Sequence, residues 1–436
     1  MPRTRNGYVR VPCETDWMLE KEEPRDSLNL VYFIALLNGI GVLLPWNMFI
    51  TIAPQYYVEY WFTQNGTTSE YADSFMSWLG LASQIPNVSV NILNIILVIS
   101  GSLLIRIVGP LVVNCFCISA VIGIVIFCAP TLEGMAWFYA VTMFLVIVIN
   151  TANGIYQNSI FGLFADFPSN YTNAIVLGNN ICGTFTAVLS IFCTIVLNDI
   201  RMVAMIYFSI SFAVLIACLA SIVLLKRSPF FTYFESKGEA TREASNSTKP
   251  SWSQIQKTIQ HAWPQFLNVF MIFLVTLSIF PAMLTASPPL RGVDGGWVSL
   301  IPENIYGGVI IFLNFNVFAT IGSFVAGLKQ WPNSNYLWVA VWLRVLFMPF
   351  FMFYNYLPHQ RTLPVLFYNE WVFGLGNSLM AFSSGYLSSL AMMYAPKVVP
   401  EALSKTAGMI SSLCLIAGIA SGVIFTFIIQ FIVTHL

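Results

Sequence analysis

The sequence predicts an all-α polytopic membrane protein with about eleven transmembrane helices. Charged residues occupy only 9% of the 436 positions and hydrophobic residues 57%, and the mean hydropathy is +0.74. Residues 28–53, 75–100 and 201–225 each form a predominantly apolar run that is long enough to cross a bilayer as one helix. A soluble chain of this length would need charge to cover its surface, so we expect lipid to surround this one.

Eleven apolar segments follow one another along the chain. They lie at roughly 28–53, 75–100, 107–129, 135–160, 172–197, 201–225, 263–286, 304–328, 335–356, 365–393 and 405–432. An odd number of spans places the two termini on opposite sides of the membrane. The segments on the side of the N-terminus hold fifteen Lys and Arg residues, and those on the other side hold three. Because basic segments tend to stay in the cytoplasm, we expect a cytoplasmic N-terminus and an extracellular C-terminus.

One long polar stretch, 226–262, divides the spans into six and five. It is rich in Ser, Thr, Lys and Glu, which is typical of a linker with little fixed structure. Its segment 252–263 fits a short amphipathic surface helix and a plain linker about equally well. The predicted organisation is a cytoplasmic tail, a six-helix N-terminal bundle, a linker loop and a five-helix C-terminal bundle. Their bounds are 1–27, 28–225, 226–262 and 263–436. A 6+5 division is typical of transporters whose two bundles rock around a central site.

Amide side chains form a stripe on the fourth predicted span. Asn150, Asn153 and Gln157 stand at i, i+3 and i+7, which places them on one helical face. Amides offer both donors and acceptors, which suits a neutral solute with many hydrogen-bonding groups. The alternative is hydrogen bonding between helices, worth about 0.6 kcal/mol per contact. So many amides on one face favour a polar pathway over simple helix adhesion.

Other residues in the spans leave alternatives open. Trp46, which follows Pro45, could stack on a flat ring, although position alone favours the interfacial aromatic belt. Arg344 is the only base well inside a span, and we take it as a substrate-binding candidate. It needs a partner, for which Glu370 is a candidate, or a carbonyl cluster or a water-filled cavity. Gly418 and Gly422 have the spacing of a helix-packing motif. Gly178 and Gly183 flank further amides in the fifth span and would allow close helix approach.

The residue types and motifs that the sequence lacks also narrow the range of possible functions. Acidic residues are absent from the middle of the spans, whereas ion-coupled carriers usually keep them there. The chain is therefore expected to be a passive carrier of a neutral solute. The eight cysteines form no CxxC pattern and the three histidines are scattered, so we expect no metal and no cofactor. No HExxH motif is present, and we expect neither an enzyme nor a nucleic-acid partner.

The loop 54–73 carries acids, no base and the sequon Asn65-Gly66-Thr67. Our topology places this loop outside the cytoplasm, so we expect a glycan on Asn65. We take the plasma membrane as the location; endosomal and lysosomal membranes remain alternatives. The oligomeric state stays open.

Several motifs together resemble the equilibrative nucleoside transporter family. The segment 26–57, DSLNLVYFIALLNGIGVLLPWNMFITIAPQYY, is similar to the first helix of that family, and 154–166, GIYQNSIFGLFAD, to the fourth. Further similarity lies at 344–349, 384–390 and 406–408. The resemblance implies a fold like the major facilitator superfamily but short by one helix. It also implies alternating access and facilitated diffusion of nucleosides, sometimes of nucleobases.

The same resemblance assigns residues. It implies that Trp46 and Gln157 line the central cavity together with Asn316, and that Gly178 and Gly183 match family glycines. The chain departs from the family in the eighth helix. An acid and a base that contact the ribose in the family are replaced by Ala319 and Ser323.

Two interpretations of this departure stay open. Sugar recognition is rebuilt from Asn314, Asn316 or Ser323, or the preference has moved to nucleobases or another small neutral solute.

Overall fold

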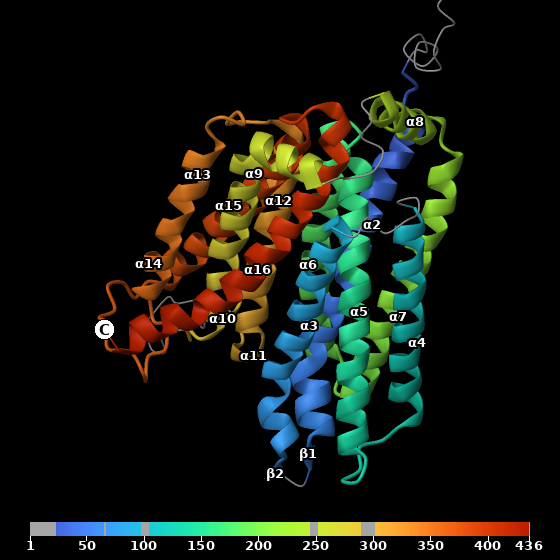
Figure 1. The fold of residues 1–436 in the computed structure, drawn as a ribbon. Coiled ribbons are helices and arrows are strands. Elements are labelled where there is room, and N and C mark those ends of the chain that lie inside the picture. The colour runs from blue at the N-terminus through green and yellow to red at the C-terminus, as the bar shows by residue number, and fades with distance from the viewer. Residues whose placement is uncertain (1–22, 65–66, 97–103, 245–251, 289–300, 436) are drawn as a thin grey trace, which may run out of the picture.

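A computed structural model of the chain describes residues 23–64, 67–96, 104–244, 252–288 and 301–435 (Figure 1). The predicted glycosylation site Asn65 and residues 1–22 of the predicted tail lie outside these ranges. The described helices before the middle of the chain are α2 (Leu30–Ile52), α3 (Glu70–Ile96), α4 (Ile105–Phe127), α5 (Met135–Phe164), α6 (Ser169–Val196), α7 (Ile200–Arg227) and α8 (Pro229–Ala244). Those after it are α9 (Trp252–Ile279), α10 (Ala282–Thr285), α11 (Glu303–Tyr306), α12 (Asn314–Leu328), α13 (Leu337–Leu343), α14 (Phe347–Met352), α15 (Glu370–Lys397) and α16 (Ser404–His435).

Shorter helical runs extend or join these helices. Wide π-helical turns run over Ala53–Trp61, after α2, and over Gly307–Leu313, before α12. Single 3-10 turns cover Ser27–Asn29, Arg344–Leu346 and Glu401–Leu403. The strands β1 (Thr63–Gln64) and β2 (Thr67–Thr68) pair antiparallel, with Thr63 opposite Thr68. This small pair is the single departure from an all-α chain in the described residues.

Each of the eleven predicted segments falls on a described helix or helical run, so the predicted fold class is confirmed. Within the described ranges, eight helical runs are long and apolar enough to cross a membrane. The other three predicted segments fall on α3, on the interrupted run Leu337–Met352 and on α15. The first of these, α3, is less apolar because amides such as Asn91 and Asn94 lie on it, and both are buried against protein.

The polar stretch after α7 differs from the prediction. Residues 229–244 form α8, and α9 begins at Trp252 and continues into the next span without a break. The prediction of little fixed structure is therefore wrong for α8. Its first turns carry three phenylalanines, which are buried against Phe167 in the connection between α5 and α6. The ring centroids of Phe231 and Phe234 lie 5.6 Å and 5.2 Å from that of Phe167. The buried phenylalanines form an apolar face on α8, which the polar average composition of this segment does not predict.

Two sets of helices make up the molecule, which we call the N-terminal half (α2–α7) and the C-terminal half (α9–α16). They meet where α6 packs on α12 and α15, and where α3 and α5 pack on α16. The contact of α5 with α16 lies at Asn158 and Gly162, near the end of α5 that adjoins α8. From there α16 runs obliquely away from α5, as Figure 1 shows. Near the far end of α16, Phe427 is 68% exposed. The halves are therefore joined more closely at the α8 end than at the opposite end on this side.

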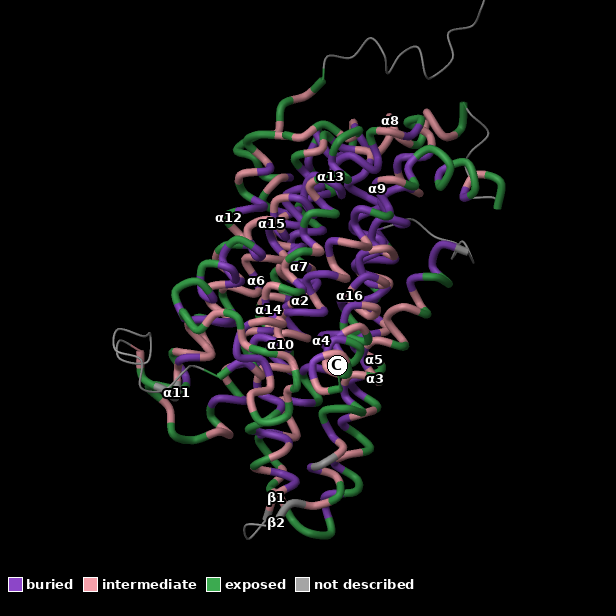
Figure 2. Tube along the Cα trace, turned by 90° about the vertical axis from the view of Figure 1, so that its left-hand side faces the viewer, coloured by how far each residue is buried: buried purple, intermediate pink, exposed green. Residues whose placement is uncertain are grey.

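Burial follows the same arrangement. Figure 2 shows buried segments in the interior and exposed ones along the outer surface and at many connections. Large apolar side chains such as Phe116, Phe144 and Trp338 stand on the outer surface with more than half of their area exposed. A contiguous apolar exterior of this kind is expected where lipid, rather than water, covers the protein.

Candidate functional site

The amide stripe on α5 does not act as one surface. The Nδ2 of Asn150 donates to the carbonyl of Val146 in its own helix, at 2.9 Å. The Oδ1 of Asn153 accepts from Asn114 on α4, at 2.7 Å. Asn153 therefore makes the hydrogen bond between helices that the sequence left as the alternative, whereas Asn150 bonds its own helix. A one-face pattern predicts which residues lie together on a helix, but it does not predict what packs against that face.

Gln157 behaves differently from its two neighbours on the stripe. Its side chain is 3% exposed, and its Nε2 has no hydrogen-bond partner. A buried amide group without a partner costs about 1–3 kcal/mol, so such groups are rare unless something satisfies them. In a carrier the missing partner is readily supplied by a bound solute or by water. Gln157 is therefore the residue of the stripe whose buried side-chain nitrogen lacks a hydrogen-bond partner.

Gln157 lies between two residues of α5 that bond different helices. The preceding Tyr156 donates its hydroxyl to Asn38 Oδ1 on α2, at 2.8 Å. The following Asn158 donates to the carbonyl of Met409 on α16, at 2.9 Å, and accepts from Asn94 on α3. Asn158 thus joins the two halves, while Tyr156 joins helices of the N-terminal half. Gln157 lies between these two contacts.

Trp46 lies near the middle of a long helical run rather than at its end. The run extends from Ser27 to Trp61, so Trp46 is about 22 Å from one end and about 28 Å from the other, at 1.5 Å per residue. An aromatic-belt residue belongs at the membrane surface, so this depth argues against that alternative. The indole is half-buried and lies parallel to the ring of Phe49, with centroids 6.1 Å apart. The adjacent Asn47 donates to Cys182 Sγ on α6, at 3.3 Å.

A seam of uncharged polar groups joins α6 to α12 across the two halves. Asn180 Nδ2 donates to Ser323 Oγ at 2.6 Å, and Asn173 Nδ2 donates to the carbonyl of Ser323 at 3.1 Å. The hydroxyls of Thr184 and Thr320 lie 2.9 Å apart and share a hydrogen bond. The sequence reasoning missed this seam. Its signal was present, because Asn173, Asn180 and Thr184 stand at i, i+7 and i+11 on one face of α6.

The positions where the chain departs from the family that it resembles are taken up by helix packing. Ser323 is fully buried, and its hydroxyl also donates to the carbonyl of Gly385 on α15, at 3.1 Å. Ala319 lies where α12 and α15 approach so closely that a Cβ at Gly385 would overlap the Ala319 carbonyl. Asn314 donates to the carbonyl of Gly374 and accepts from Ser378, both on α15. Asn314 and Ser323 are thus committed to packing in this structure.

Asn316 on α12 uses the nitrogen of its carboxamide for a hydrogen bond within its own helical run, and the carboxamide oxygen has no such bond. Its Nδ2 donates to the carbonyl of Phe312 in the same run, at 2.8 Å, and its Oδ1 lies against the backbone of Gly183. A methyl group at 183 would overlap this carboxamide, so the glycine makes room for it. Asn316 and Gly183 therefore face each other between the two halves.

Asn179, one of the amides that Gly178 and Gly183 flank in the fifth span, joins this group, although the sequence did not mark it as substrate-binding. Its Oδ1 is buried and has no hydrogen-bond partner. The residue before it on α6, Gly178, packs on the backbone of Leu36 and Gly39 in α2. The residue after it, Asn180, donates a hydrogen bond to α12. Exposed α6 residues such as Phe185 and Val188 lie on the opposite face. Asn179 therefore points inward between α2 and α12.

Arg344, which the sequence offers as a substrate-binding candidate, bonds neighbouring helices in the structure. It is 2% exposed and donates to four neutral oxygens rather than to Glu370. The acceptors on α9 are Ile272 O at 2.9 Å and Thr276 Oγ1 at 2.8 Å. Those on α15 are Ser383 Oγ at 3.1 Å and Met380 O at 3.4 Å. These bonds tie α9 and α15 together within the C-terminal half.

The two glycines of the last span lie against α9. A Cβ at Gly418 would be 2.6 Å from the carbonyl oxygen of Phe270, and one at Gly422 would be 2.7 Å from that of Leu274. These contacts keep α16 and α9 at close approach. In the described part of the chain no group of three His, Cys, Asp or Glu side chains is placed to hold a metal ion.

Two helical halves with exposed apolar surfaces, a polar seam between them and the buried unpartnered amide groups of Gln157 and Asn179 fit a membrane carrier of polar solutes. A solved structure, that of the proton:xylose symporter XylE of the major facilitator superfamily, matches with a TM-score of 0.60 at 12% identity. The match covers 91% of this chain and 88% of that one, and shows that the fold is shared.

Sequence relatives identify the family. The nucleoside transporter family profile matches residues 143–431. Equilibrative nucleoside transporter 1 of Rattus norvegicus is 29% identical, over 95% of this chain and all of its own length. Equilibrative nucleoside transporter 2 of Homo sapiens is 27% identical, over 95% of this chain and 99% of its own. The chain belongs to the nucleoside transporter family.

Proposed function

We propose that the protein is a facilitative nucleoside transporter that works by alternating access of a site between its two halves. The observation that supports this most directly is the unpartnered Nε2 of the buried Gln157, in a chain of the nucleoside transporter family. Nucleosides are neutral and rich in hydrogen-bonding groups, which is what uncharged amides recognise. The names of the relatives favour nucleosides over free nucleobases.

The proposed site uses residues from both halves. The flat base stacks near Trp46, and Gln157 and Asn179 bond its polar edge or the sugar from the N-terminal half. Asn316 contributes from the C-terminal half. Asn150, Asn153 and Arg344 position the helices that carry the site, because Asn150 Nδ2, Asn153 Oδ1 and the Arg344 guanidinium already have partners within the protein. Gly178, Gly183, Gly418 and Gly422 permit the close helix contacts around it.

The proposed mechanism needs no ion gradient. In the described membrane-crossing helices the acids lie near the ends, as Glu70 and Glu370 do, and none lies at the middle. A carrier that binds its solute about equally well in both open states lets the concentration gradient set the direction. We further propose that residues 28–225 and 263–436 act as two bundles. The N-terminus would face the cytoplasm, the C-terminus would face the exterior, and the plasma membrane would be the location.

The test is uptake of labelled nucleosides and nucleobases by proteoliposomes containing the full-length protein. We expect uridine and adenosine to enter at rates that do not change when proton and sodium gradients are removed at fixed membrane potential. Loss of uptake without a gradient would contradict the passive mechanism. Entry of adenine without any nucleoside would support the nucleobase alternative instead.

A pair of variants tests the site itself. Gln157→Ala removes the unpartnered amide, and loss of one hydrogen bond of about 0.5–1.5 kcal/mol should raise the KM for uridine roughly two- to tenfold. Asn150→Ala is the matched control, because that amide bonds its own helix. Equal KM values for Gln157→Ala and wild type in folded protein would remove Gln157 from the site.

A further inference from the structure

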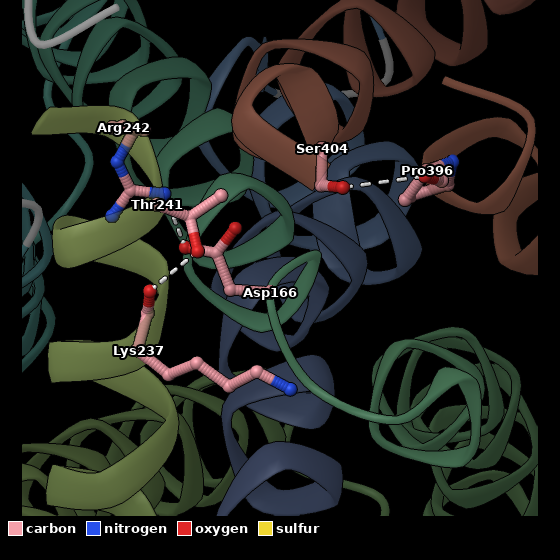
Figure 3. Close-up of polar contacts among 6 residues, drawn as sticks. All are labelled: Asp166, Lys237, Thr241, Arg242, Pro396 and Ser404. Carbon is pink, nitrogen blue, oxygen red and sulfur yellow. Dashed lines mark hydrogen bonds and ion pairs between the residues drawn. The ribbon is translucent and has the colours of Figure 1, made fainter. Parts of the chain in front are cut away.

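Helix α8 is docked onto the N-terminal half by an ion pair. Arg242 Nη1 lies 2.6 Å from Asp166 Oδ2 in the connection between α5 and α6, and the two side chains are only 11% and 9% exposed. Figure 3 shows Asp166 pointing toward the turn of α8 that carries Thr241 and Arg242. The hydroxyl of Thr241 donates to the carbonyl of Lys237 one turn earlier, at 2.8 Å. A partly buried, hydrogen-bonded ion pair of this kind is stronger than an exposed one.

The sequence of α8 makes this close approach possible. Gly238 faces Asp166, and a Cβ at this position would lie 2.6 Å from Asp166 Oδ2 and 3.2 Å from Arg242 Nη1. Any larger residue would therefore push α8 away from the carboxylate. At the other end of α8 the rings of Phe231 and Phe234 pack on Phe167, one residue after Asp166. The docking is thus specified both by an aromatic contact and by a charged one.

A cavity of about 350 Å³ lies between α8 and the two halves. Asp166 and Ser169 line it from the N-terminal half, and Lys237 and Gly238 line it from α8. Pro396 and Ser404 line it from the C-terminal half, where the Ser404 hydroxyl donates to the Pro396 carbonyl at 3.3 Å. This cavity exists in its present form only while the two halves are together at the α8 end.

Charged side chains on the two sides of the boundary between the halves also interact here. The charged groups whose fields act on Asp166 are Arg242 and Glu239 on α8 and Lys405 on α16. Lys405 is attracted by Asp166 and repelled by Arg242 and by Arg106 on α4. Burial raises the pKa of the Asp166 carboxyl, and the attraction of Arg242 and Lys405 opposes that shift. Asp166 thus offsets nearby cations at this junction together with Glu239, and it acts on Lys405 more strongly than Glu239 does.

We propose that Asp166 is a positioning residue for transport, which holds α8 and the C-terminal half together and so keeps the α8 end of the carrier closed. This inference rests on the proposed alternating access. When the halves separate at this end, Lys405 leaves Asp166 and the cavity opens. Neutralising Asp166 leaves Arg242 and Lys405 repelling each other across the boundary, which favours the state open at the α8 end.

The experiment measures access to the cavity wall. Ser404 is 8% exposed, so a cysteine there should react slowly with a hydrophilic maleimide while the α8 end is closed. The full-length protein carrying Ser404→Cys is placed in lipid nanodiscs, and labelling of the protein without this substitution is subtracted. We expect Asp166→Asn and Arg242→Gln each to increase the labelling rate at least about fivefold, the lower range of coupling between two sites.

Two further variants separate this role from general stability. Glu243→Gln neutralises an exposed acid next to Arg242 and should leave the labelling rate unchanged. The charge reversal Asp166→Arg with Arg242→Asp should restore slow labelling, at least in part, because the pair is rebuilt. Should Asp166→Asn fail to fold, Arg242→Gln decides the question alone.

The outcomes are distinct from those of the uptake test. Equal labelling in Asp166→Asn, Glu243→Gln and the parent protein would overturn the proposal, as would failure of the charge reversal to slow labelling in folded protein. Labelling does not depend on which solute is carried. If wild type took up no nucleoside, the proposed function would fail, whereas the labelling rates would still decide the role of Asp166.

Discussion

Ser323→Ala tests whether the departure from the family in α12 is a packing feature or a substrate contact. The substitution removes a hydroxyl that accepts from Asn180 at 2.6 Å and donates to Gly385 at 3.1 Å. Each such bond contributes about 0.5–1.5 kcal/mol net, so the loss should total about 1–3 kcal/mol. Asn180 keeps its second bond, to the carbonyl of Val176, which argues for a value at the lower end.

The free energy of unfolding is measured by titrating the protein in mixed micelles with a denaturing detergent. Ser211→Ala is the matched control, because Ser211 is equally buried and its hydroxyl bonds only the carbonyl of Tyr207 in its own helix. A double-mutant cycle with Asn180→Ala isolates the contact between the halves. We expect a coupling free energy of about 1 kcal/mol, as for residues in direct contact.

Uptake kinetics give the second readout. If Ser323 joins helices, the KM for uridine should stay within about twofold of wild type, because no bond to the solute is lost. Two results would refute the reasoning. One is a coupling free energy of zero between Ser323 and Asn180. The other is a tenfold rise in the KM for uridine without a rise for a 3′-deoxy analogue, which would show that Ser323 binds the sugar and costs about 1.4 kcal/mol there.

The remaining predictions concern close contacts and the glycan. Gly183→Ala should reduce the uridine uptake rate because its Cβ overlaps the Asn316 carboxamide, whereas Gly80→Ala, which meets open space, should not; equal rates would contradict the contact. Gly418→Ala should lower the free energy of unfolding by about 1–3 kcal/mol through overpacking on Phe270. Gly123→Ala, in open space, serves as its control, and an unchanged Gly418→Ala would refute the packing. Arg344→Lys should lower the melting temperature, because an ammonium cannot reach four acceptors on α9 and α15; a temperature equal to wild type would show that these bonds contribute little. Asn65→Gln should remove a glycosidase-sensitive shift on a gel, and a shift that survives the substitution would place the glycan elsewhere.

The spans were predictable because each one is a local property of the chain. Twenty or so apolar residues must form a helix in lipid, whatever packs beside them. The same argument could not find α8, whose composition is polar on average. Its three phenylalanines become informative only beside Phe167, which lies more than sixty residues earlier. A tertiary contact therefore decides the structure of this segment.

The site was predictable only in part, for a related reason. Helical periodicity correctly places Asn150, Asn153 and Gln157 on one face of α5, but periodicity says nothing about partners. Asn153 bonds Asn114, which is 39 positions away, while Gln157 has no partner for its Nε2. The seam of α6 with α12 joins residues about 140 positions apart. No single-helix pattern can distinguish an amide that binds another helix from one that is available to a solute.

The neutral contacts between the halves and the charged contact with α8 suit different tasks. Along α6 and α12 the groups are neutral, and a neutral hydrogen bond is worth only about 1 kcal/mol, so small movements can exchange one partner for another at low cost. At the α8 end Asp166, which is paired with Arg242, lines a cavity, where separation exposes charges to water instead of stranding them in lipid. Charged groups along the seam of α6 with α12 would have no such access to water when the halves separate. A carrier with a neutral seam and a charged contact at one end can therefore exchange hydrogen bonds along the seam as it rocks, while the charged contact favours the state that is closed at that end.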